Sequence, residues 1–185
     1  MNVSYVLDLP KGSSLIPGRP AKWVLDNWQL SEITTFATGF PQNVVLQTTE
    51  NFDFTGGGDG GGVVQTGRAQ LPHGEKTFYR WFDTSVFKRP SGRGDIGTDF
   101  SNVKFRGPGF ANYDLSMFKN VPIGGEKGKL QFRWEIYNLF NHTQFNGVNN
   151  IARFDPQGVQ VNAAFGQVTS ARQERRMQGS LRFIF

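Results

Sequence analysis

The sequence contains no cysteine, only two histidines and no long run of apolar residues. The missing cysteines exclude disulfides and thiolate metal sites. Because no stretch of about 18 apolar residues occurs, no transmembrane helix is expected. Neither histidine has a carboxylate or a second histidine at metal-ligand spacing, and no serine lies in a nucleophile-elbow context. We therefore expect no metal, no other cofactor and no enzymatic activity.

The composition is low in aliphatic residues and high in aromatic residues and glycine. Hydrophobic residues make up 37% of the 185 positions, with 18 phenylalanines and 23 glycines. This balance is typical of a β-rich chain, and it also suits a membrane barrel with a polar inner face and aromatic girdles. The net charge is +5, but the basic residues are scattered, so we expect no nucleic-acid partner.

The carboxyl-terminal segment, residues 174–185, alternates between polar and apolar side chains, which is the period of a β-strand. One face carries Met177, Gly179, Leu181, Phe183 and Phe185. The other carries Glu174, Arg176, Gln178, Ser180 and Arg182, and only Ile184 breaks its polarity. Such a strand suits a wall with lipid on one side and water on the other.

Residues 130–137 repeat this pattern. Leu130, Phe132, Trp134 and Ile136 alternate with Gln131, Arg133, Glu135 and Tyr137. A strand of a soluble sandwich would alternate in the same way, because one of its faces packs on a core. The terminal position of Phe185 favours the membrane interpretation, since a last residue is usually frayed and an apolar aromatic there suggests recognition or membrane contact.

These patterns predict an all-β fold, an antiparallel meander that forms part of an outer-membrane β-barrel with long loops. The residues predicted to face lipid or to serve assembly are Leu130, Phe132, Trp134, Ile136, Leu181, Phe183 and Phe185. Those predicted to face the lumen are Arg133, Glu135, Ser180 and Arg182.

The rest of the chain predicts further strands within one domain that covers residues 1–185. Strands are expected at 3–9, 23–38, 43–54, 113–118, 129–140 and 159–169. In residues 23–38 the alternation slips, which indicates either a bulge or a short helical start near Ala21. Residues 55–110 are rich in glycine and proline and predict one long loop, 141–158 predict a second loop, and Gly124 and Gly125 predict a turn. The glycine run at 56–62 lacks the lysine and hydroxyl residue of a phosphate loop, so a flexible loop is expected.

The first residues do not form a signal peptide, because they lack a basic start, a long apolar stretch and a small-residue cleavage site. An outer-membrane protein needs an export signal. The barrel interpretation therefore implies that this chain is a fragment or a truncated reading frame.

Several motifs in order resemble a known family. The runs GPGFANYDLSMFKNVPIG, LQFRWEIYNLFNHTQF and FGQVTSARQERRMQGSLRFIF resemble the carboxyl-terminal part of TonB-dependent receptors. More narrowly, they look like the Oar-like group of soil bacteria, whose members carry a carboxypeptidase-regulatory-like domain. The upstream runs WQLSEITTFATGFP and YRWFDTSVF fit the same order.

The resemblance implies a transport barrel of about 22 strands, filled by a plug domain and driven by the TonB energy-coupling complex in the bacterial outer membrane. The plug and most strands are absent from this sequence, so its own role is expected to be structural. The implied partners are outer-membrane lipid, the barrel-assembly machinery that reads the terminal strand, and the remainder of the receptor.

The alternative is a soluble or surface-attached β-sandwich that binds glycans. Its ligand contacts would come from the aromatic residues between Phe78 and Phe87. This alternative places Trp134 and Phe183 inside a core, whereas the barrel leaves them on an open face.

Overall fold

The structure is a computed structural model that describes residues 1–16, 18–56, 61–97, 104–123 and 128–185. Within them the chain is built of strands, with one short helix, α1 (Arg19–Leu25), and two 3-10 turns, η1 (Gly12–Ser14) and η2 (His73–Glu75). The predicted all-β fold is confirmed. None of the helical segments in the described ranges has the length and apolar character needed to cross a membrane.

The chain divides into two compact units. Unit 1 comprises Met1–Ala37, Phe110–Gln144 and Gln173–Phe185, and unit 2 comprises Thr38–Gly109 and Phe145–Arg172. The predicted long loops therefore correspond largely to a unit with packing of its own.

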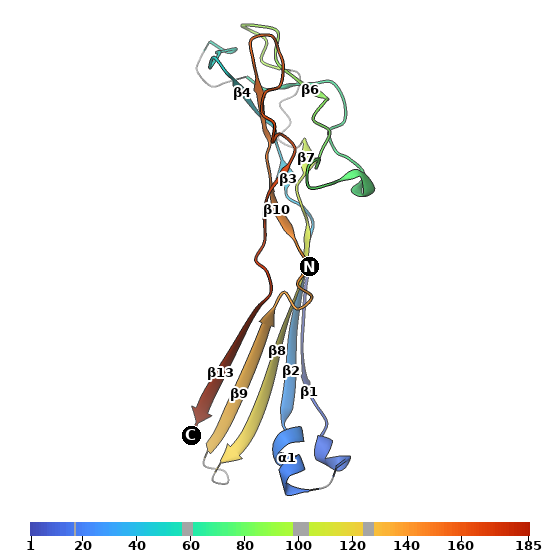
Figure 1. The fold of residues 1–185 in the computed structure, drawn as a ribbon, viewed down its shortest axis with the longest axis vertical. Helices are drawn as coiled ribbons and strands as arrows, with labels where there is room; N and C mark the ends of the chain where they lie inside the picture. Colours follow the sequence, from blue (N-terminus) through green and yellow to red (C-terminus); the bar gives the residue numbers. More distant parts are fainter. Residues whose placement is uncertain (17, 57–60, 98–103, 124–127) are drawn as a thin grey trace. The chain divides into compact units, whose positions relative to one another are not determined.

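Unit 1 is a five-stranded antiparallel sheet (Figure 1). Its strands are β1 (Asn2–Asp8), β2 (Trp28–Ala37), β8 (Phe110–Ile123), β9 (Gly128–Tyr137) and β13 (Arg176–Ile184). They lie in the order β1-β2-β8-β9-β13, so each strand of this sheet pairs with the one that follows it along the chain. This order is the antiparallel meander that the sequence predicts.

The connections between these strands are unequal at the two ends of the sheet. At one end Ala37 pairs with Phe110 and Tyr137 pairs with Arg176. Residues 38–109 and 138–175 therefore both connect strands at this end of the sheet. At the other end β8 is followed by residues 124–127, and residues 9–27 join β1 to β2. The turn predicted at Gly124 and Gly125 lies outside the described residues. Long loops at one end and shorter turns at the other are typical of outer-membrane barrels.

The segment 23–38 begins in a helix and continues as a strand. Helix α1 occupies the first part of this segment, with Pro20 in its first turn. A proline is tolerated there because main-chain N–H groups of the first turn have no partner within the helix. Strand β2 then keeps one continuous register with β1 and with β8, so it contains no bulge. The pattern breaks because Glu32 falls on the mainly apolar face and Ile33 on the mainly polar face.

Unit 2 contains short strands: β3 (Pro41–Gln42), β4 (Val45–Thr48), β5 (Val64–Gln65), β6 (Phe87–Lys88), β7 (Phe105–Arg106), β10 (Phe145–Val148), β11 (Ile151–Phe154) and β12 (Val168–Ala171). They pair two by two, and β4 pairs with β11 in parallel. The prediction of a strand over 43–54 is right only for β4. The prediction of a loop over 141–158 is wrong, because β10 pairs with β12 and all of β11 pairs with β4.

The strand predicted over 159–169 is also largely absent, because side-chain hydrogen bonds hold most of it in turns. The Asn162 amide donates to the Ile151 carbonyl oxygen (2.8 Å), and its carbonyl accepts from the Ala164 main-chain N–H (3.1 Å). Asparagine commonly bonds nearby main chain in this way and competes with strand pairing. Gln160 forms an isolated bridge with Phe154, and a paired strand begins only with β12 at Val168.

An aromatic core holds unit 2 together. Phe82 is fully buried, its ring stacks on that of Phe105 with centroids 4.0 Å apart, and the Phe165 ring meets it edge-on at 5.2 Å. The other buried members of this core are Val44, Val63, Ala69, Phe87, Ala152 and Phe154. The described part of residues 55–109 contains the two-residue strands β5, β6 and β7, and it supplies much of this core. Residues 57–60 of the glycine run lie outside the described residues.

Candidate functional site

Strand pairing places the predicted lipid-facing residues of two neighbouring strands on one surface. Leu130 pairs with Phe183, and Phe132 pairs with Leu181. Residues directly opposite in an antiparallel pair point to the same face. Trp134 and Phe183 are 38% and 53% exposed, so the described part of the chain does not bury them as a sandwich core would.

The same surface, here called the apolar face, continues across the whole sheet of unit 1. Register adds Val3, Tyr5 and Leu7 from β1, Trp28, Leu30 and Phe36 from β2, and Tyr113, Leu115, Met117 and Val121 from β8. The alternation of 113–118 indicates the β8 members in the sequence. The β2 members were missed, because Glu32 and Ile33 obscure the period there.

Glycines receive the large rings of the apolar face. Gly179 lies opposite Trp134, and a Cβ on it would lie 3.5 Å from the indole. Gly128 accommodates the Phe183 ring, which would lie 3.2 Å from a Cβ at that position. Each ring therefore covers the main chain of the neighbouring strand, a device that stabilises strand pairs at glycine.

Two charged residues interrupt the apolar face, and each has partners. The Glu32 carboxylate accepts hydrogen bonds from the Tyr5 hydroxyl and from Thr34 Oγ1. The Lys119 ammonium lies 5.3 Å from the centre of the Trp28 ring and donates to the Asp26 carbonyl oxygen. Pairing of this kind lowers the cost of a charge beside apolar surface.

The opposite surface, here called the polar face, carries the residues predicted to face the lumen. Arg133 and Glu135 form an ion pair, and the Gln178 amide donates to the Glu135 carboxylate. The Arg133 guanidinium also lies 5.0 Å from the centre of the Phe118 ring. Ser180 pairs with Arg133 and Arg182 with Gln131, so both belong to this face and both are exposed. The register thus places the predicted lipid-facing residues of β9 and β13 on the apolar face and the predicted lumen-facing residues on the polar face, and the medium that each face contacts stays a prediction.

Phe185 lies one residue beyond the end of β13. It is 95% exposed, and its ring stacks on the Phe183 ring with centroids 5.8 Å apart. Its side chain therefore extends the aromatic row of the apolar face past the last paired residue.

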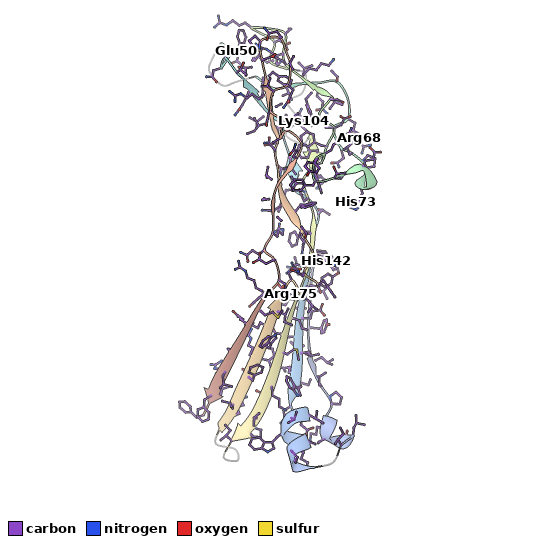
Figure 2. All side chains as sticks on the ribbon, in the orientation of Figure 1. Glu50, Arg68, His73, Lys104, His142 and Arg175 are labelled. Atoms are coloured by element: carbon purple, nitrogen blue, oxygen red, sulfur yellow. The ribbon has the colours of Figure 1, made fainter. Side chains whose placement is uncertain are left out.

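A corner at the end of β9 is hydrogen-bonded to β8 and to the segment that leads into β13. The buried Asn138 has a positive φ of 53°, and its main-chain N–H donates to the Asp114 carboxylate of β8 (3.0 Å). Its side-chain amide donates to the main-chain oxygens of His142 (3.2 Å) and Gln173 (3.3 Å). Figure 2 labels His142 beside this corner and Arg175 on the approach to β13. Asparagine tolerates the left-handed conformation, which explains its place in this turn.

A second polar cluster fixes the connection between β1 and β2. The buried Asp26 carboxylate accepts the Ser13 main-chain N–H (2.9 Å) and the Ser13 hydroxyl (2.8 Å). These hydrogen bonds, with the main-chain bond as the larger cause, hold the pKa of the Asp26 carboxyl below its ordinary value. The ionised form therefore keeps η1 close to the end of α1.

Acid is expected to loosen this cluster. Because the pKa of Asp26 is lowered in the folded chain, its stabilising contribution is complete above its unfolded pKa of about 3.9 and is lost as the pH falls through the lower folded value. A nitroxide on Leu15→Cys should become more mobile below about pH 4, as electron paramagnetic resonance would record. In Asp26→Asn the label should be mobile at every pH. A pH response of equal size in Asp26→Asn would contradict this assignment.

Unit 2 offers an open cleft of about 410 Å³. Its lining includes Thr48, Asn51, Asp53 and Arg153 together with the rings of Phe52 and Phe54. Within the part of the chain that the structure describes, no cluster of three or more histidine or acidic side chains could hold a metal ion.

The aromatic residues proposed for glycan binding separate into two groups. Phe82 and Phe87 belong to the buried core and cannot contact a ligand. Phe78 and Tyr79 are exposed, and their rings contact each other edge-on at 5.1 Å. Neighbouring aromatic residues of this loop differ in burial because some meet the core and others meet solvent, and the sequence alone does not reveal which.

A family model described as an outer membrane beta barrel domain matches residues 1–178. The chain belongs to this family. Membership agrees with the two-faced sheet and with the antiparallel meander, and an outer-membrane location follows from it. No curated protein and no solved structure matches the chain.

Proposed function

We propose that this barrel domain is the carboxyl-terminal wall of a TonB-dependent, Oar-like receptor in the bacterial outer membrane. The observation that carries the proposal is the two-faced sheet, whose register gathers apolar side chains on one side and polar ones on the other. Four of the runs that resemble the Oar-like group include β2, β8, β9 or β13, and the run YRWFDTSVF lies in unit 2. The role is structural and not enzymatic. The chain contributes strands of the barrel wall, and the rest of the receptor contributes the plug and the remaining strands.

The apolar face has the dimensions of a membrane wall. Trp28 and Phe36 lie at the two ends of β2 on this face. Eight residues of strand span about 27 Å. A tilt of about 40° reduces this to about 20 Å across the bilayer, close to the roughly 25 Å apolar band of outer-membrane barrels. The rings at either end thus suit the aromatic girdles, with Leu30, Met117 and Trp134 between them in the hydrocarbon.

The polar face would line the lumen. The ion pair of Arg133 and Glu135 and the amide of Gln178 form a hydrogen-bonded row that needs water or a polar plug beside it. Unit 2, which includes the 410 Å³ cleft, is the part we assign to the ligand mouth. A soluble sandwich would need a second layer over the apolar face, and the described strands of unit 1 form a single sheet.

The receptor assignment is tested by sequencing the genome around this reading frame. An in-frame plug domain and further barrel strands encoded ahead of Met1 are the expected result. A complete upstream gene with its own stop codon and no plug domain would overturn the receptor proposal, although it would leave the family unchanged.

Removal of the terminal ring is expected to impair assembly into the outer membrane. In a bacterial host, Phe185→Ala should reduce the amount of chain recovered from outer-membrane fractions severalfold, since we propose that the assembly machinery reads this strand. The side chain is almost fully exposed, so its loss costs little packing. Phe40→Ala, which removes an exposed ring from unit 2, is the matched control and should leave the yield unchanged. Equal yields for both variants would contradict the assembly role.

A further inference from the structure

The segment that joins β1 to β2 exposes large apolar side chains in its described residues, 9–16 and 18–27. We call it the connector. Leu15 is 85% exposed, Trp23 66%, and Val24 and Ile16 are exposed to a similar degree. A connector exposed to water would favour polar residues here, and a compact globular one would bury these four. Their exposure indicates that another apolar medium covers them.

The connector is attached to the rim of the apolar face. The Trp28 indole N–H donates to the Val24 carbonyl oxygen (2.8 Å), and the Lys119 ammonium donates to the Asp26 carbonyl oxygen. Trp28 and Lys119 both project from the apolar face, as their mutual pairing shows. Figure 1 shows α1 at the end of β2. The exposed side chains of the connector are therefore continuous with the surface that we assign to lipid.

The charges of the connector favour an anionic surface. It contains the basic residues Lys11, Arg19 and Lys22 and a single acidic residue, Asp26. Asp26 is buried and bonded to Ser13, whereas Lys11 and Lys22 are exposed. Apolar side chains combined with exposed lysines and a tryptophan are typical of segments that lie at the headgroup level of a bilayer.

We propose that the connector is an interfacial anchor that lies in the headgroup region of the bilayer, at the end of the sheet where β1 joins β2. Leu15, Trp23 and Val24 enter the boundary of the acyl chains, and Lys11 and Lys22 contact lipid phosphates. The occupant of this surface is a phospholipid leaflet. This inference rests on the proposed lipid-facing role of the apolar face, and it adds a second contact that fixes the depth of the barrel wall.

The natural absence of cysteine makes a direct test simple. Single variants Leu15→Cys and Val24→Cys carry an environment-sensitive fluorophore, in the full chain reconstituted into vesicles of phosphatidylethanolamine and phosphatidylglycerol. Two matched controls report on the sheet: Leu181→Cys from the apolar face and Ser180→Cys from the polar face, both at exposed positions. Quenchers are nitroxides attached to the lipid near the headgroup or deep in the acyl chain, and iodide in the water.

The expected result is a blue-shifted emission at Leu15 and Val24 that the shallow nitroxide quenches more strongly than the deep one. Leu181 should respond mainly to the lipid quenchers and Ser180 mainly to iodide. If Leu181 and Ser180 differ as expected but Leu15 and Val24 respond only to iodide, the anchor is wrong and the sheet assignment stands. A blue shift at Leu15 and Val24 without lipid quenching would show that protein covers the connector, which also overturns the anchor. Equal responses from Leu181 and Ser180 would overturn the lipid-facing assignment itself.

Discussion

Replacing Trp134 by arginine is expected to destabilise the sheet in a lipid bilayer by about 2–4 kcal/mol, the cost of an arginine near the middle of a barrel wall. Trp134 lies on β9 between the aromatic ends of the apolar face, over Gly179 of β13. An arginine there loses this contact and brings a charge into hydrocarbon. Urea titration of the chain in phospholipid vesicles, followed by circular dichroism, measures the change in the free energy of unfolding.

Two variants separate the charge from the lost packing. Ser116→Arg places the same side chain on the polar face of the neighbouring strand, where it pairs with Glu135, and it should change stability by less than about 0.5 kcal/mol. Trp134→Phe keeps an apolar ring on the lipid side and should also be mild. If Trp134→Arg and Ser116→Arg destabilise the chain equally, the two faces have been assigned wrongly.

Replacing Phe82 by alanine is expected to cost about 3–5 kcal/mol, the usual range for removing a fully buried phenylalanine. The ring contacts Phe87, Phe105 and Phe165, so its loss leaves a cavity bordered by three other rings. The described part of unit 2 has short strand pairs and no large sheet to compensate for this loss. Hydrogen exchange of peptides from 61–97 and 145–172 should become markedly faster, as mass spectrometry would record.

Tyr79→Ala is the matched control for this cavity. Tyr79 lies three residues before Phe82 in the same loop, but it is 73% exposed, so the variant should stay within about 0.5 kcal/mol of the natural chain. Tyr79→Ala would also test whether the exposed ring supports glycan binding, without a change in stability. Exchange that is equally fast in both variants would show that the core is not centred on Phe82.

The phenylalanines of this protein serve two different structural roles. On the sequence alone their abundance indicates aromatic girdles at a membrane interface, and Phe36, Phe132 and Phe183 do lie on the apolar face. Phe82, Phe105 and other rings instead fill the core of unit 2. Composition cannot separate these uses, because burial depends on which segments meet in space.

Alternation determined the regular strands and the assignment of their faces. Residues 130–137 and 176–183 alternate with a period of two, which indicated two strands, each with one apolar face. The sequence therefore predicted the all-β fold class, the antiparallel meander and the division of Trp134 from Arg133. In β2 a charged residue, Glu32, lies on the apolar face and an apolar residue, Ile33, lies on the polar face. The alternation is weaker there, so the sequence did not show which β2 residues belong to the apolar face.

Only the tertiary structure decided how the long loops are used and what the connector contacts. Strand β4 finds a parallel partner more than 100 residues away in β11, and no local pattern encodes such a pairing. The burial of Phe82 likewise depends on segments that are distant in the sequence. The same is true of the hydrogen bond from Asn138 to Gln173, and the bond between Trp28 and Val24 joins a strand to a helix. A local pattern records which way a side chain points along its own strand, whereas the partner that it meets is fixed only when the chain folds back on itself.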